Sequence, residues 1–92
     1  MSDAVTRADR LAAVRGFILD RFLFSDDPSL LPDDQSLIEA GILDSMGALE
    51  LIEFLEERFG VRIRDADVTP GALESVHRIV ELVEARLAVD DG

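Results

Sequence analysis

Residues 43–59 read LDSMGALELIEFLEERF, and this stretch decides the fold of the chain. At about 100° per residue, one set of its apolar side chains falls within an arc of about 100°, as on a helix that packs against a core. The set comprises Ala48, Leu51, Ile52, Leu55 and Phe59. We therefore predict an amphipathic helix that begins at Asp44–Ser45 and ends at Phe59, where Gly60 closes it.

A different side of this helix carries a second face, which consists of Met46, Leu49, Glu50, Glu53, Glu56 and Glu57. Several of its acids are three or four residues apart, and each such like-charge pair costs a few tenths of a kcal/mol. The helix dipole favours negative charge only in the first turn, so it does not offset the later acids. Because this cost has no local compensation, we predict that the face is a binding surface.

The chain before this stretch predicts a first helix from about Thr6 to Phe24. Its apolar stripe consists of Leu11, Val14, Ile18 and Phe22. Phe17 and Phe24 lie beside that stripe and are expected to widen the buried face. The sequence Asp26-Asp27-Pro28 ends the helix, because proline cannot continue it and disfavours a helical residue before it.

Residues 25–44 connect the first helix to the central one, and a structureless connection of this length is uncommon in a compact domain. Ser36 and Glu39 fit a capping box, and Gly41 suits the left-handed position that closes a helical turn. The loop also holds enough apolar residues to pack on a core: Leu30, Leu31, Leu37, Ile42 and Leu43. We expect an ordered loop that crosses the core.

After the central helix, residues 61–64 read VRIR and alternate between apolar and basic. Since no other segment offers a strand partner, we predict an extended linker that buries Val61 and Ile63. Residues 65–68 are expected to form one short helical turn. Ser75 then caps a last helix, whose apolar stripe consists of Val76, Ile79, Val80, Val83 and Leu87.

These elements predict an all-α fold, a small four-helix bundle with a long ordered loop between the first two helices and a short third helix. The chain of 92 residues suits one domain with one core, and 48% of its residues are hydrophobic. We expect residues 1–92 to form a single domain, ordered from about residue 6 to residue 88, with a tail at each end.

The net charge is −11, and it is concentrated in one part of the chain. Residues 20–57 hold eleven acids against Arg21 alone, whereas residues 1–19 have a net charge of +1 and residues 58–92 one of −2. Such a field repels nucleic acid and anionic membranes, and it speeds encounters with basic protein surfaces. We therefore expect basic protein partners rather than nucleic acid or membrane.

Several other classes of function lack the residues they need. The chain has no cysteine, so it forms neither disulfides nor thiolate metal sites, and its acids do not follow the calcium-loop pattern. The only histidine, His77, has no evident nucleophile to activate. Membrane-spanning segments and a signal peptide are not evident either. We predict a cytoplasmic, monomeric protein without a metal site or an enzymatic activity.

The residues around Ser45 resemble the acyl carrier protein family. Asp44-Ser45-Met46 follows Gly41-Ile42-Leu43 after a long loop, and an acidic helix ending at Phe59-Gly60 follows it. In that family the serine of such a triplet receives a 4′-phosphopantetheine arm from coenzyme A. The resemblance runs from about Leu11 to about Leu87 and implies a four-helix fold. It also implies that Ser45, next to Asp44, carries the arm and an acyl or aminoacyl cargo.

The same resemblance implies protein partners with basic patches, namely a phosphopantetheinyl transferase, an acyl- or aminoacyl-activating ligase and downstream acyl-transfer enzymes. Asp44, Glu50, Glu56 and Glu57 match acidic contact positions of the family, while Met46 and Leu49 match exposed apolar ones. Gly47 and Glu53 depart from the fatty-acid type, and the local sequence is more similar to D-alanyl and other stand-alone aminoacyl or specialised carriers.

On the residues alone, other interpretations remain open. Asp44 and Ser45 are also what a plain helix cap requires. The chain would then be a carrier-like interaction module that is never modified. A small serine-dependent enzyme is a further alternative, although no base for Ser45 is evident. A modification assay distinguishes the carrier from the unmodified module.

Overall fold

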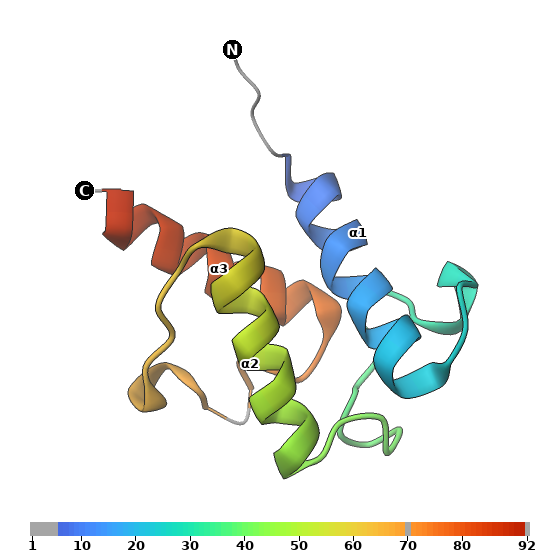
Figure 1. Ribbon diagram of the computed structural model, residues 1–92. Coiled ribbons are helices and arrows are strands. Elements are labelled where there is room, and N and C mark those ends of the chain that lie inside the picture. The colour runs from blue at the N-terminus through green and yellow to red at the C-terminus, as the bar shows by residue number, and fades with distance from the viewer. Residues whose placement is uncertain (1–5, 70, 92) are drawn as a thin grey trace.

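The computed structural model describes residues 6–69 and 71–91, which contain three α-helices and no β-strand. The helices are α1 (Arg7–Ile18), α2 (Ser45–Phe59) and α3 (Val76–Asp91) (Figure 1). The predicted all-α class is therefore confirmed. The four-helix count is not confirmed, because the short third helix of the prediction is a single 3-10 turn, Asp65–Asp67. None of the described helices has the length and apolar character needed to cross a membrane.

Helix α1 begins with a capping box that the side chains of Thr6 and Asp9 form together. It continues as a π-helical segment, Leu19–Leu23, and ends at Phe24, whose φ of 52° is left-handed. The predicted span of the first helix matches these elements. The expected burial of Phe24 is wrong, since its side chain is 87% exposed. The wider π turn shifts the helical register, so a wheel with 3.6 residues per turn misplaces the last side chains.

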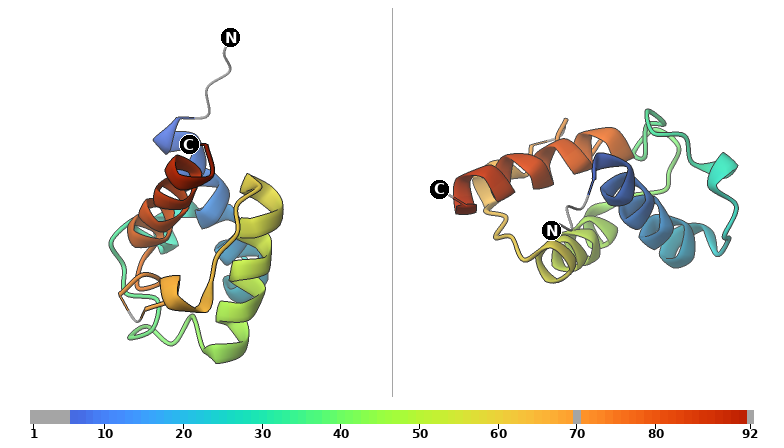
Figure 2. Two further views of the ribbon diagram at one scale, coloured as in Figure 1. Left: turned by 90° about the vertical axis from the view of Figure 1, so that its left-hand side faces the viewer. Right: turned by 90° about the horizontal axis from the view of Figure 1, so that it is seen from above.

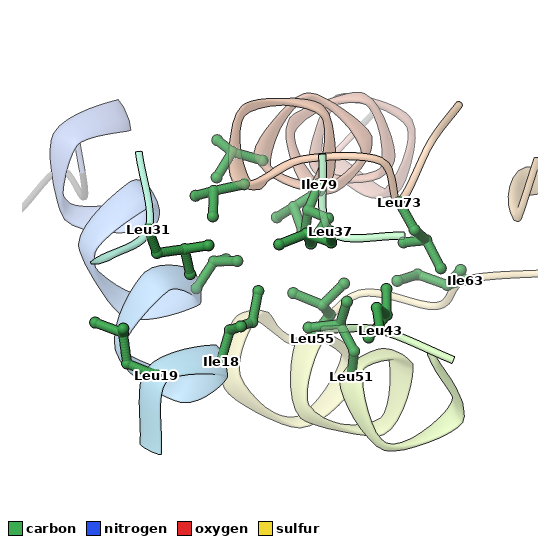
Figure 3. Close-up of a cluster of buried hydrophobic side chains, with 14 of the residues drawn as sticks. Ile18, Leu19, Leu31, Leu37, Leu43, Leu51, Leu55, Ile63, Leu73 and Ile79 are labelled. Carbon is green, nitrogen blue, oxygen red and sulfur yellow. The ribbon is translucent and has the colours of Figure 1, made fainter. Parts of the chain in front are cut away.

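The three helices surround one hydrophobic core, which Figure 3 shows between α1, α2 and α3. Each predicted stripe supplies fully buried side chains: Val14 and Ile18 from α1, Leu51 and Leu55 from α2, and Val76, Ile79, Val80 and Val83 from α3. At about 25 cal/mol per Å² of apolar surface removed from water, these contacts are the main source of stability.

The long loop between α1 and α2 is ordered and crosses the core, as predicted. Leu31, Leu37 and Leu43 are buried, and Figure 3 shows Leu37 and Leu43 between α2 and α3. The loop contains a 3-10 turn, Pro28–Leu30, and Gly41 adopts the left-handed conformation with φ of 73°. The expected burial of Leu30 is wrong, because the side chain at the end of this turn is 53% exposed.

Backbone hydrogen bonds attach this loop to the start of α3. The Leu37 N–H donates to the Glu74 carbonyl oxygen at 2.7 Å, and the His77 N–H donates to the Asp33 carbonyl oxygen at 2.9 Å. The second bond satisfies one of the N–H groups that the first turn of a helix leaves without an internal acceptor. The predicted Ser75 cap is also present, since its Oγ accepts from the Arg78 N–H at 3.2 Å.

Ion pairs join the start of α1 to α3. The Glu84 carboxylate accepts hydrogen bonds from Arg7 and from Arg10, the latter at 3.0 Å. The hydrogen bond from Arg7 lowers the pKa of the Glu84 carboxyl below its ordinary value, and partial burial offsets part of this effect. The pair therefore stabilises the folded state while Glu84 is ionised.

The linker after α2 is extended, as predicted. Gly60 closes the helix in the left-handed conformation with φ of 69°, and Val61 and Ile63 are buried. In both views of Figure 2 the linker leaves the end of α2 and passes close to α3. Arg86 on α3 donates from Nε to the Arg62 carbonyl oxygen at 3.0 Å, which ties the linker to that helix.

Candidate functional site

Ser45 is the first residue of α2, and its side chain is exposed. Asp44 precedes it as the N-cap in an extended conformation, and Asp44 Oδ1 accepts from the Gly47 N–H at 2.8 Å. The N–H groups of Ser45 and Met46 have no acceptor among the described residues. The start of α2 thus presents a hydroxyl beside two unpaired N–H donors and the positive end of the helix dipole.

A cavity of about 420 Å³ opens beside this hydroxyl. Residues from the loop, from α2 and from the segment before α3 line it, and most of them are apolar: Ile38, Leu43, Asp44, Ser45, Ala48, Val68, Thr69 and Leu73. The order of the loop matters here, because Leu43 and the exposed Ile38 are held at the cavity by the bonds between the loop and α3. An exposed serine therefore lies next to an apolar recess.

The sequence reasoning missed a contact behind Ser45 between Gly47 and Phe22. Gly47 is buried although it lies in the first turn of α2. A Cβ atom at this position would lie 3.0 Å from Phe22 Cε1 and 3.2 Å from Asp44 Oδ1. Any side chain there would displace the Phe22 ring. This contact accounts for the departure of Gly47 from the acid of the fatty-acid type. A glycine among strong helix formers was the available signal.

The structure divides the acids of the second face into two pairs. Glu53 and Glu57 are exposed, and their carboxylates make no ion pair or hydrogen bond with the described residues. Glu50 pairs with Arg21 from the π-helical segment, and this hydrogen bond raises the pKa of the Arg21 guanidinium. Glu56 Oε2 accepts from the Ile63 N–H at 2.9 Å, so this carboxylate also holds the linker.

The two apolar residues of that face extend into solvent. Met46 is 75% exposed and Leu49 is 64% exposed. Both lie within the first turns of α2, close in sequence to Ser45. The residues of the second face therefore lie on the same helix as Ser45. Of their side chains, those of Glu50 and Glu56 form an ion pair or a hydrogen bond with other described residues.

Among the described residues that line the cavity beside Ser45, Asp44 is the one with an ionisable side chain. His77, the only histidine, lies on α3, where its Nε2 is 3.3 Å from Glu81 Oε2, and it does not line the cavity beside Ser45. Asp44 is engaged as a helix cap. No group of three or more potential metal ligands occurs among the residues that the structure describes. A nucleophilic serine would need a base that this arrangement does not provide.

Comparison with known proteins agrees with this geometry. The family described as "Phosphopantetheine attachment site" matches residues 21–85, more than half of the chain. The D-alanyl carrier protein of Streptococcus gordonii is 36% identical over 64 residues, which cover 70% of this chain and 78% of that protein. The D-alanyl carrier protein of Streptococcus sanguinis is 41% identical over 59 residues, which cover 64% and 73%.

A solved structure described as "Structure of KstB-PCP(apo)" has a similar fold. Its TM-score is 0.72, with 24% sequence identity, and the match covers 92% of this chain and 90% of that one. Proteins of the matched family carry a covalently attached 4′-phosphopantetheine and are not catalytic by themselves. On these grounds the chain belongs to the phosphopantetheine-attachment family of carrier proteins.

Proposed function

We propose that Ser45 carries the 4′-phosphopantetheine arm and that the chain works as a stand-alone carrier of an acyl or aminoacyl group. The observation that supports this most is the exposed Ser45 hydroxyl at the start of α2, beside the unpaired N–H groups of Ser45 and Met46. A phosphodiester at a helix N-terminus is stabilised by such donors and by the helix dipole. The residues present therefore fit the phosphate end of the arm.

Two neighbours of Ser45 have distinct roles in this proposal. Asp44 holds the first turn of α2 through the Gly47 N–H, so the serine is presented from a fixed helix end. The apolar cavity of about 420 Å³ beside Ser45 offers a surface where uncharged parts of the arm or its cargo can be shielded from water. When bound, the arm supplies the terminal thiol that holds the cargo as a thioester.

The names of the relatives support one class of cargo in this proposal. Proteins named D-alanyl carrier protein match this chain over most of their length. We infer that an aminoacyl group is a natural candidate for the cargo, with other acyl groups as the broader class. The chain has no cysteine, so no thiol of the protein itself would compete for the thioester.

A modification assay tests the attachment site. The protein is incubated with coenzyme A and a broad-specificity phosphopantetheinyl transferase, and its intact mass is measured. We expect the wild type to gain one arm and Ser45→Ala to gain none. Ser36→Ala is the matched control, since Ser36 Oγ also caps a turn by accepting from the Glu39 N–H at 3.2 Å. Modification of the Ser45→Ala variant would refute the proposal, as would an unmodified wild type.

We further propose that the second face of α2, from Met46 to Glu57, meets basic partner enzymes such as the transferase and an activating ligase. Surface charges of this kind act mainly on the association rate and on its salt dependence. Glu53 and Glu57 are the clearest candidates, because their carboxylates are exposed and make no ion pair or hydrogen bond with the described residues. Glu50 and Glu56, in contrast, also hold Arg21 and Ile63.

Charge reversal tests whether the position of the acids on α2 matters for docking, or only the net charge of the protein. We expect Glu53→Lys with Glu57→Lys to slow arm transfer at low salt, with the deficit shrinking as salt rises. The control, Asp26→Lys with Asp34→Lys, changes the net charge equally at two exposed positions of the loop. If both double variants are modified at the same rate, the acids of α2 have no special role for that transferase, even where Ser45 carries the arm.

A further inference from the structure

A second cavity lies at the other end of α2, and its lining is basic although the chain as a whole carries a net charge of −11. It has a volume of about 850 Å³ and is lined by Glu56, Gly60, Val61, Arg62, Arg64 and Arg86. Helix α2 has 15 residues, so this cavity is separated from Ser45 by about 22 Å along the helix. It shares no residue with the cavity beside Ser45, and it shares only Glu56 with the second face of α2.

The arginines of this cavity differ from most others in the chain in whether they pair with a carboxylate. Six of the nine arginines pair with a carboxylate among the described residues: Arg7, Arg10, Arg15, Arg21, Arg78 and Arg86. Arg58 lies over the Phe59 ring at 5.6 Å from its centroid. Arg62 and Arg64 are exposed and form no ion pair within the part of the chain that the structure describes. Within the described part of the chain, Arg62 and Arg64 are thus the arginines whose guanidinium groups contact neither a carboxylate nor an aromatic ring.

The alternation of residues 61–64 explains why both arginines line one cavity. Side chains of an extended segment point alternately to opposite sides. Because Val61 and Ile63 are buried in the core, Arg62 and Arg64 are both directed outward. Two residues of extended backbone span about 6–7 Å, which is the separation expected between their Cα atoms. The same spacing separates alternate residues of any extended peptide.

The backbone that carries these arginines is fixed on both sides. The Ile63 N–H donates to Glu56 Oε2 at 2.9 Å, and the Arg62 carbonyl accepts from Arg86 Nε at 3.0 Å. The Arg64 N–H donates to Asp67 Oδ2 at 3.0 Å, and the Asp67 N–H returns a bond of 2.8 Å to the Arg64 carbonyl. A segment held in this way loses little further backbone entropy when a ligand binds.

From these observations we propose that Arg62 and Arg64, which line this cavity, form a docking site for an acidic peptide segment of a partner protein, with carboxylates at alternate positions of an extended chain. Guanidinium groups bind carboxylates through paired, charge-assisted hydrogen bonds. Two carboxylates also lie in or near the cavity. Glu56 accepts from the Ile63 N–H, and Asp67 accepts from the Arg64 N–H and pairs with Arg86 at 3.8 Å.

The other anionic occupants fit less well. The carboxylates of an extended peptide repeat at the same spacing as the Cα atoms of Arg62 and Arg64, whereas a compact oxyanion has no such repeat. A second copy of this chain carries its own charge of −11, which opposes association between copies. At 0.15 M salt the Debye length is about 8 Å, so the acids near Ser45 are screened from a peptide at this end of α2.

The test uses the full chain and a synthetic peptide of alternating glutamate and threonine, capped at both ends, with glutamine replacing glutamate in the control peptide. Backbone amide shifts at residues 60–64 and 86 are followed by NMR at 0.15 M salt. We expect saturable shifts with the acidic peptide only. In Arg62→Gln with Arg64→Gln, the affinity is expected to fall at least about tenfold, since each charge-assisted bond contributes to binding. Arg58→Gln, a neighbouring exposed arginine outside the cavity, is expected to bind normally.

Each other outcome overturns the proposal. If the wild type does not bind the acidic peptide, the proposal is wrong. If the double glutamine variant binds the peptide as tightly as the wild type does, Arg62 and Arg64 do not form the docking site. If inorganic pyrophosphate shifts the same amides at lower concentration than the peptide does, the cavity is a site for small anions. A concentration-dependent rise in molecular mass that the double variant lacks would identify a second copy as the occupant. Peptide binding does not involve Ser45, so these outcomes are independent of arm attachment.

Discussion

The contact between Gly47 and Phe22 links the end of the first helical segment to the start of α2, and a double-mutant cycle measures it. Replacing glycine by alanine inside a helix ordinarily stabilises it by about 1 kcal/mol. Here the new methyl group would lie 3.0 Å from Phe22 Cε1. Inserting a methyl group into packed structure costs about 1–3 kcal/mol. The two effects oppose each other, so Gly47→Ala is expected to change wild-type stability by between 0 and about 2 kcal/mol, in the destabilising direction.

In a Phe22→Ala background the ring is absent, and the helical preference is opposed only by the approach to Asp44 Oδ1 at 3.2 Å, which both backgrounds share. Gly47→Ala is then expected to stabilise the protein by up to about 1 kcal/mol. The difference between the two backgrounds is the coupling energy, expected to be about 1–3 kcal/mol, in the range found for residues in contact. Because the chain has no tryptophan or tyrosine, urea unfolding is followed by far-ultraviolet circular dichroism.

The cycle has a clear contrary result. If Gly47→Ala stabilises both backgrounds by the same amount, the coupling energy is zero and the ring does not rest on Gly47. The reasoning that glycine replaces the acid of the fatty-acid type because of Phe22 would then be refuted. As a control, the slope of the unfolding free energy against urea concentration should be similar in all four proteins. A changed slope would mean that a substitution alters the surface exposed on unfolding and not only the stability.

Three further predictions concern the stability of the fold. Leu55→Ala should lower the free energy of unfolding by about 2–5 kcal/mol in urea titrations, because this side chain is fully buried; a loss below about 1 kcal/mol would place it outside the core. Added salt should raise the melting temperature by screening the net charge of −10 in residues 20–57, and a melting temperature indifferent to salt would show that these acids are compensated. The hydrogen bond from Arg7 lowers the pKa of Glu84 in the folded state below the ordinary value of 4.5. The ionised Glu84 side chain therefore stabilises the fold above pH 4.5, and this stabilisation is lost as the pH falls through the lowered pKa. Glu84→Gln should therefore be less stable than wild type at pH 7, and the difference should shrink at acid pH; a constant difference would mean that packing and not charge is responsible.

Much of the fold could be predicted because helical periodicity reports which face of each segment is buried. The stripes through Leu51, Leu55, Val80 and Val83 were identified in this way, and all four side chains are buried. Local backbone chemistry identified the turns, since few residues other than glycine adopt positive φ without strain. Gly60 closes α2 for this reason.

The parts that could not be predicted depend on contacts between segments distant in sequence. The π-helical segment changes the register of its last residues, which a wheel of constant period cannot represent, and Phe24 is exposed as a result. The pairing of Glu50 with Arg21 and the packing of Phe22 on Gly47 both arise from the way α1 meets α2. Sequence spacing identifies the faces of one helix but not the neighbours of each face.

For the candidate site, the sequence identified the position of Ser45 and the Asp44 cap, because both follow from the local rules for a helix start. It did not reveal the cavity beside Ser45, since the lining residues come from three separate segments. Nor did it reveal that Arg62 and Arg64 share a second cavity, although the alternation of residues 61–64 was visible. A motif becomes a site only when the fold shows what surrounds it.

The most direct test of the central claim is to locate the arm within the protein isolated from its native host. Trypsin cleaves after Arg21 and Arg58, which releases residues 22–58 as one peptide with four serines: Ser25, Ser29, Ser36 and Ser45. Fragmentation of this peptide in a mass spectrometer assigns the added mass to one of them. Our account predicts 4′-phosphopantetheine on Ser45 alone, with any cargo attached to it. The arm on another serine, or a peptide without any arm, would contradict it.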